Sequence, residues 1–168
     1  MKLYTIKDIR ALKPCYDPVE RGLCAEDWTG TAVDVLRAEN VPAEDRIWLV
    51  SHWLDDRTNR LWACWCVRNT PLADGRVVWD LLTDERSRIV VEVTERYANG
   101  DATQAELAAA RDAAGAAARA AAWAAAWDAA GAAARAAAGA AAWDAAGAAA
   151  WDAQIKHLIE MISEAETV

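Results

Sequence analysis

Four cysteines are the residues of this chain best suited to redox or metal chemistry: Cys15, Cys24, Cys64 and Cys66. Positions i and i+2 lie about 200° apart around a helix. If Cys64 and Cys66 lie on one helix, they are therefore poorly placed to share a metal ion or a disulfide. We expect this pair to be structural and buried. Cys15 and Cys24 fall in a stretch with loop character and have no CxxC spacing. The sequence therefore predicts no metal, no cofactor and no redox centre.

Two histidines, His52 and His157, are the only candidates for general acid–base work at neutral pH. Either could meet a cysteine or an aspartate in space. However, the chain has neither a nucleophile elbow nor a glycine-rich phosphate loop, and several of its eight glycines belong to a repeat. We expect a protein without enzymatic activity.

Tryptophan is the most conspicuous chemical resource, with ten residues in a chain that has no phenylalanine. Those of the first hundred residues, Trp48, Trp53, Trp62, Trp65 and Trp79 among them, are expected in the core by default. The alternative is a pocket for a nucleotide-like signal, in which rings stack on a base and guanidinium groups pair with phosphate. The residues that would form it are Arg57, Arg60, Arg68, Trp62 and Trp65.

The elements that must position these side chains are predicted to be helices throughout. Apolar residues recur at helical spacing after Thr5, after Thr31, after Pro42 and over 55–69, and again over 84–99, where Asn99-Gly100 ends the helix. The segment 55–69 is apolar on every side and is expected to be a central helix. Residues 75–82 fit either a helix or a strand. We predict an all-α fold, with a bundle of short helices in residues 1–100.

Residues 101–168 form an alanine- and tryptophan-rich arm. Thr103 and Glu106 match a capping box, and from there to Gln154 the chain contains no Pro, Asn or Ser that could make a turn. Alanine has the highest helix propensity, so the tract must be helical. A large or unusual residue recurs at every fourth position, and Asp112, Asp128 and Asp144 repeat at intervals of sixteen, as gene slippage produces. We favour one long helix; a helical hairpin broken at Gly131 or Gly139 is the alternative.

The tryptophans of this arm are the predicted partner-binding residues, since an alanine helix alone cannot bury them. They are Trp123, Trp127, Trp143 and Trp151. A continuous helix of residues 103–165 would be about 90 Å long at ~1.5 Å per residue, more than a small body can cover. We therefore expect either a protein partner or self-association through the arm.

Charge restricts the partner. The net charge is −8, which disfavours direct binding to nucleic acid or to anionic lipid. The first residues have no apolar signal region, and the alanine tract carries Asp at intervals that would lie at hydrocarbon depth in a bilayer. The expectation is a cytoplasmic protein with reduced thiols and no membrane contact.

The stretch "DERSRIVVEVTERYANGDATQAELAAARDAA" resembles a family of alanine-rich bacterial and phage proteins called putative immunity proteins. That family shows an acidic-Arg-x-Arg start, a helix, an aromatic-Ala-x-Gly end and an alanine-rich run. The matching residues here are Asp84, Arg86, Arg88, Glu92, Tyr97, Ala98 and Gly100. The likeness covers about residues 55 to 125 and departs from the family in the tryptophan-bearing repeats. It implies an immunity-like or anti-defence protein that sequesters a toxin or a defence component, and it brings no catalytic residues.

Overall fold

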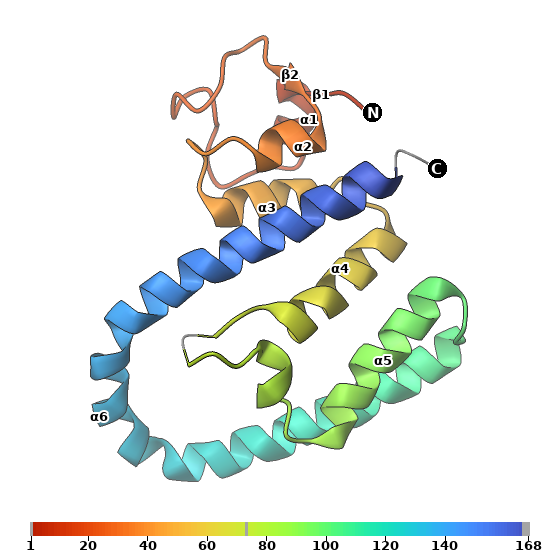
Figure 1. Ribbon diagram of the computed structural model, residues 1–168, viewed down its shortest axis with the longest axis vertical. Coiled ribbons are helices and arrows are strands. Elements are labelled where there is room, and N and C mark those ends of the chain that lie inside the picture. The colour runs from red at the N-terminus through yellow and green to blue at the C-terminus, as the bar shows by residue number, and fades with distance from the viewer. Residues whose placement is uncertain (1, 73, 166–168) are drawn as a thin grey trace. The chain divides into compact units, whose positions relative to one another are not determined.

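The protein is mainly α-helical, as its sequence predicts (Figure 1). The computed structural model describes residues 2–72 and 74–165, and within the last helix it leaves out the side chains of residues 117–146 and 148. The elements, in chain order, are β1 (Tyr4–Thr5), α1 (Ile6–Ala11), β2 (Thr29–Gly30), α2 (Ala32–Leu36), α3 (Ala43–Ser51), α4 (Asp56–Asn69), the 3₁₀ helix η1 (Val78–Leu81), α5 (Glu85–Asn99) and α6 (Gln104–Ala165).

Tertiary contacts divide the chain into two compact units. One comprises Met1–Asp55 together with Gln154–Val168, and the other comprises Asp56–Ala153. The predicted boundary at residue 100 does not coincide with either cut. The reason is that α4 packs on α5 in the second unit, whereas the last residues of α6 belong with the first.

Local capping signals determine where the helices of the first unit begin. The Asp8 carboxylate accepts hydrogen bonds from the backbone N–H and the hydroxyl of Thr5 at 2.7 Å each. At α2, Asp34 accepts from Thr31 in the same way, and the Thr31 hydroxyl accepts from the Asp34 N–H at 3.1 Å. Each box satisfies N–H groups that have no partner within the helix. Both predicted helix starts are thereby confirmed.

The first unit also contains a two-stranded antiparallel ribbon, which was not predicted from the sequence. Tyr4 pairs with Gly30 and Thr5 pairs with Thr29. Gly30 is required there, because a Cβ at this position would lie 2.6 Å from Cζ2 of Trp28. The core of this unit consists of residues from several elements: Tyr4, Ile6, Ile9, Val33, Val35, Leu36, Ile47, Leu49, Val50, Ile155 and Leu158.

In the second unit, α5 is the helix that its sequence predicts. Asp84 caps its first turn by accepting from the N–H of Arg86 at 2.9 Å, and Gly100 ends it with a φ of 84°. The capping box at the start of α6 is also present, with Glu106 accepting from the N–H of Thr103 at 2.7 Å. The segment 75–82 was expected to be either a helix or a strand. It contains the short 3₁₀ helix η1, and Val77 before it forms an isolated bridge with Pro71.

The structure decides two expectations for the helices, one of which is confirmed and one of which is wrong. Of the hairpin and the continuous helix, the structure has the continuous one, because α6 runs unbroken from Gln104 to Ala165. The expectation that 55–69 is a central helix is wrong, since Cys64 is the buried residue of α4 and its other sides are half-buried or exposed. The helix packs on α5 and η1, but Trp62 and Trp65 on it are only half-buried.

Candidate functional site

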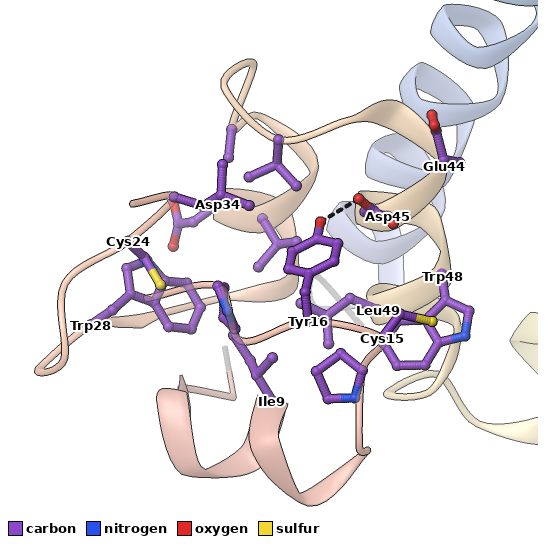
Figure 2. A pocket seen from close by; sticks show the side chains of 16 residues that line it. Ile9, Cys15, Tyr16, Cys24, Trp28, Asp34, Glu44, Asp45, Trp48 and Leu49 are labelled. Carbon is purple, nitrogen blue, oxygen red and sulfur yellow. Dashed lines mark hydrogen bonds between the residues drawn. The ribbon is translucent and has the colours of Figure 1, made fainter. Parts of the chain in front are cut away.

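A cavity of about 390 Å³ lies within the first unit, between the loop of residues 12–28 and the helices α1, α2 and α3 (Figure 2). Its volume is within the range of sites that hold small molecules or single side chains. Its floor is apolar and is formed by one buried residue from each helix: Ile9, Val35 and Leu49. The side chains with chemical character around it are Cys15, Tyr16, Cys24, Trp28, Asp34, Glu44, Asp45 and Trp48.

The aromatic side chains are distributed along the cavity. Figure 2 shows Trp28 with Cys24 at one end, Trp48 with Cys15 at the other, and Tyr16 between them. In the same view, the carboxylates of α2 and α3 lie along the upper side, opposite Ile9. The cavity thus combines an apolar floor with aromatic walls and an acidic edge.

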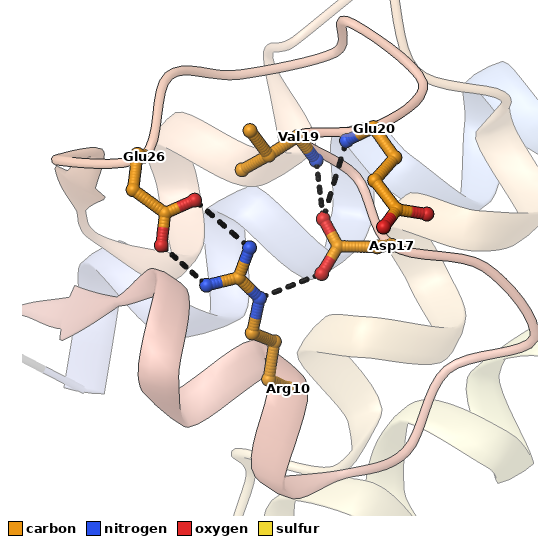
Figure 3. Close-up of polar contacts among 5 residues, drawn as sticks. All are labelled: Arg10, Asp17, Val19, Glu20 and Glu26. Carbon is orange, nitrogen blue, oxygen red and sulfur yellow. Dashed lines mark hydrogen bonds and ion pairs between the residues drawn. The ribbon is translucent and has the colours of Figure 1, made fainter.

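The loop that covers the cavity is fastened by Arg10 at the end of α1 (Figure 3). Its Nε donates to Asp17 at 2.6 Å, and its two terminal nitrogens donate to the two Glu26 oxygens at 2.5 and 2.9 Å. The second Asp17 oxygen accepts from the N–H groups of Val19 and Glu20, which folds the loop into a turn. These hydrogen bonds from Arg10 lower the pKa values of Asp17 and Glu26 and raise that of the guanidinium.

Tyr16 is the second point at which the loop is attached. Its hydroxyl donates to Asp45 on the first turn of α3, and the guanidinium of Arg21 lies over its ring at 4.0 Å from the centroid. Burial, and then the bond to Asp45, raise the pKa of Tyr16 to about 12. Its hydroxyl is therefore a neutral donor at physiological pH, and one Asp45 oxygen accepts from it.

Each tryptophan of the cavity has a support. Trp28 packs over the backbone of Gly30, which is close enough to exclude any larger residue. Trp48 contacts His52 one turn later on α3, with the ring centroids 4.5 Å apart, and the Nδ1 of His52 lies 2.7 Å from the Trp48 carbonyl oxygen. The expectation that Trp48 lies in the core is wrong, because 38% of it is exposed. It lies at the cavity edge, since Ile47, Leu49 and Val50 occupy the buried face of α3.

Two cysteines line the cavity as free thiols, Cys15 exposed and Cys24 half-buried. The pKa of Cys24 is raised, mainly by burial, so the thiol form dominates and its reactivity is low. Cys64 is buried, as expected, whereas Cys66 is half-buried, and burial raises the pKa values of both thiols to about 11. Among the side chains that the structure describes, no three His, Cys, Asp or Glu come together as metal ligands would.

The arginines of the predicted nucleotide-like pocket lie in the second unit and contact α5. Arg57 donates to the Ala98 carbonyl and to the Asn99 side chain at 3.0 Å each, at the helix end where a cation is favoured. Arg60 pairs with Asp56 at 3.0 Å and lies over the ring of Tyr97. These guanidinium groups hold α4 against α5.

Arg68 also joins the two helices of this pair. Its guanidinium forms two parallel bonds with Glu95 at 2.7 and 2.8 Å and lies 4.2 Å from the ring centroid of Trp79. Trp62 and Trp65, the predicted stacking residues, are half-buried on α4. None of these five predicted residues lines the cavity of the first unit.

The predicted partner-binding residues all lie on α6. Trp151 is half-buried, whereas the side chains of Trp123, Trp127 and Trp143 lie outside the part of the chain that the structure describes. Their role as anchors stays a prediction.

Sequence reasoning missed the cavity residues Tyr16, Trp28, Asp34, Asp45 and Glu44 as a group. A signal was present in the stretch 12–28, which is long for a structureless loop in a compact domain and contains two aromatic residues and two cysteines. Loops of this length are usually functional or disordered, and this one is fastened at several points.

Comparisons with known proteins identify no relative: no protein family, no curated protein and no solved structure matches the chain. The resemblance to immunity proteins therefore rests on the residues quoted for it. None of the helices, over the residues that the structure describes, contains a stretch long and apolar enough to cross a membrane.

Proposed function

We propose that this is a non-enzymatic binding protein that holds a partner protein at the cavity of its first unit and thereby blocks it. The observation that carries the proposal is the cavity itself, with Trp28, Tyr16 and Trp48 along an apolar floor and carboxylates at its edge. Binding energy at protein interfaces concentrates in a few aromatic anchors set in desolvated pockets. A cavity of this size accepts one or two side chains of a partner.

The charge of the chain supports a basic partner. A net charge of −8 steers positively charged proteins toward it, most strongly at low salt. The resemblance at residues 84–100 suggests the class, which is a toxin or a component of a bacterial defence system. We place this interaction in the cytoplasm, where thiols such as Cys15 and Cys24 stay reduced.

The alanine-rich helix α6 supplies a second candidate contact. We retain Trp123 and Trp127 as candidate anchors for the same partner, with self-association of the chain as the other way to cover them. Light scattering at high micromolar concentration separates the two, because only self-association raises the mass of the isolated protein.

Site-specific photo-cross-linking tests the proposal in the native host. A benzophenone amino acid replaces Trp48 at the cavity, Trp123 or Trp127 on α6, and Leu3, which is 67% exposed and does not line the cavity. We expect one protein to be cross-linked from position 48 and not from position 3. That protein, once purified, should bind with an affinity that falls as salt rises.

The cross-linking result also has a clear contradiction. A partner captured only from α6 would place the binding site on the helix and remove the cavity from the function. Ala38 lines the cavity, so Ala38→Trp should fill part of it. If a purified partner binds this variant with unchanged affinity, the cavity is not the binding site.

A small-molecule ligand is the second candidate, favoured by the volume of about 390 Å³. The nucleotide-like version relied on Arg57, Arg60 and Arg68, whose guanidinium groups contact α5 or neighbouring residues. Carboxylates at the cavity edge would repel phosphate there as well. If nucleotides raise the melting temperature of the protein and Arg60→Ala abolishes this shift, the nucleotide-like pocket predicted from the sequence is supported.

A further inference from the structure

The charged groups at the cavity all have the same sign. Asp34, Glu44 and Asp45 line it, and no Lys, Arg or His is among its lining residues. Aromatic ring faces attract cations as carboxylates do. We propose that the occupant is an organic cation, an ammonium or guanidinium group on an apolar body. This inference rests on the proposed function and specifies what the cavity recognises.

The cationic group belongs at the α3 end of the cavity. Glu44 and Trp48 lie one turn apart on the same side of this helix, and Asp45 is adjacent. Oδ2 of Asp45 accepts a hydrogen bond from the Tyr16 hydroxyl. Glu44 forms no hydrogen bond or ion pair with any residue in the described part of the chain, and it is exposed. Its carboxylate can therefore pair with a cation at the same end of the cavity as the exposed Trp48 ring.

The opposite end of the cavity suits an apolar body. Oδ2 of Asp34 accepts from the N–H and the hydroxyl of Thr31 at 2.8 and 2.7 Å, which lowers its pKa and keeps it charged. Asp34 thus adds negative potential to the cavity, while its Oδ2 accepts the hydrogen bonds that cap the start of α2. The contact surface at this end is the Trp28 indole together with the buried Ile9 and Val35.

The arrangement of the carboxylates favours an organic cation over a metal ion. A metal ion needs several ligand atoms converging at about 2–2.6 Å. No such group of three occurs among the side chains that the structure describes, and the three carboxylates are spread along a cavity of about 390 Å³. A separation of this kind fits a ligand with its charge at one end, such as a small amine or the Arg or Lys side chain of a partner.

A titration of the full-length protein with three small compounds tests the charge selectivity. The compounds are 2-phenylethylamine, 2-phenylethanol and phenylacetate, which share a body and differ in charge. The readout is the NMR signals of the Trp28 and Trp48 indole N–H groups, assigned with Trp28→Phe and Trp48→Phe. We expect the amine to shift both signals, with an affinity at least about tenfold above that of the alcohol, and phenylacetate to shift neither.

The outcomes separate this inference from the proposed function. Equal affinity for amine and alcohol, or tighter binding of phenylacetate, overturns the cation assignment and leaves a binding cavity in place. If none of the three compounds shifts either indole signal while the cross-linked partner still binds from position 48, the cation inference alone fails. If neither the compounds nor a partner bind, both proposals fail.

A matched pair of variants locates the cationic group. Glu44→Gln removes the carboxylate at the cavity edge, and Asp27→Asn removes an exposed carboxylate of the same unit that does not line the cavity. We expect Glu44→Gln to lower the affinity for 2-phenylethylamine about fivefold, with the alcohol unchanged. Asp27→Asn should leave both nearly unchanged. Equal losses in the two variants would reduce the effect to net charge and overturn the assigned place.

Two further probes distinguish the source of the cation. N-acetyl-arginine amide and N-acetyl-lysine amide present the groups as a partner protein would, and their affinities are compared with that of 2-phenylethylamine. Tighter binding of the arginine compound supports a protein side chain, because a guanidinium both stacks on indole and pairs with a carboxylate. Binding of the free amine alone supports a small-molecule source.

Discussion

The two units of the protein both use arginines to hold segments together, but they differ in the charges left at a cavity. In the unit of Asp56–Ala153, Arg57 and Arg68 form hydrogen bonds from α4 to α5, and Trp79 lies under Arg68. In the unit of residues 1–55 and 154–168, Arg10 fastens a loop, while Glu44 stays exposed at a cavity. Charges that satisfy one another hold a structure together, and charges left at an apolar cavity are available to a ligand.

The largest expected effect comes from the core of the cavity unit. Leu36→Ala removes a side chain that is 1% exposed and leaves a void, which should cost about 2–5 kcal/mol in free energy of unfolding. Urea unfolding measures the total loss in free energy of unfolding, and amide hydrogen exchange shows in which helices protection is lost. We expect the loss in α1–α3. Leu81→Ala, at a site 49% exposed, should change stability by less than about 0.5 kcal/mol. Equal loss in α4 and α5 would mean that the two units unfold as one.

The second effect concerns the arginine that joins α4 to α5. Arg68→Ala removes the paired bonds to Glu95 and the contact with Trp79, at a cost of about 1–2 kcal/mol. Amide hydrogen exchange should become faster in α4 and α5, and the affinity of ligands for the cavity of the first unit should stay unchanged. Arg86→Ala, which breaks a local pair with Asp84, is the control. A variant that keeps its stability but loses a ligand would instead support the predicted Arg and Trp pocket.

A smaller effect is expected where the loop meets α3. Tyr16→Phe removes the hydrogen bond to Asp45, worth about 1 kcal/mol. Because the pKa of Tyr16 is raised to about 12, its contribution is complete below pH 10 and is lost as the pH rises toward 12. Absorbance titration should show a late-ionising phenol that is missing in the variant. An unchanged titration curve would contradict the contact.

The smallest effect is local and depends on pH. Arg10→Leu should speed hydrogen exchange of the Val19 and Glu20 amides several-fold while leaving helical content unchanged. Since Arg10 lowers the pKa values of Asp17 and Glu26, its stabilisation is present at neutral pH and is lost as the pH falls through those lowered values. Acid should thus mimic the variant. Arg76→Leu, which breaks only a pair with Asp74, should leave the loop unaffected.

Elements encoded locally could be predicted from the sequence. The helix starts at Thr5, Thr31 and Thr103 depend on a residue three positions later, and the end of α5 depends on one glycine. Such signals are complete within a few residues. The single helix Gln104–Ala165 was predicted for the same reason, from alanine propensity and the lack of turn residues.

The site could not be predicted, because it depends on contacts between distant residues. Nothing near Gly30 in the sequence indicates that it pairs with Tyr4 in a ribbon, and nothing near Tyr16 indicates that its hydroxyl donates to Asp45. The pairing of Arg68 with Trp79 was missed in the same way, because Trp62 and Trp65 are the nearer residues in the sequence and were expected beside this arginine.

The division of α6 between the two units has a consequence for synthesis on the ribosome. Ile155 and Leu158 belong to the core of the cavity unit, yet they follow the whole of Asp56–Ala153. At about 5–20 residues per second, that intervening stretch takes roughly 5–20 s to translate. During this time the first 55 residues expose the apolar surface that the end of α6 later covers. The emerging chain is therefore most in need of chaperones before the core of this unit is complete.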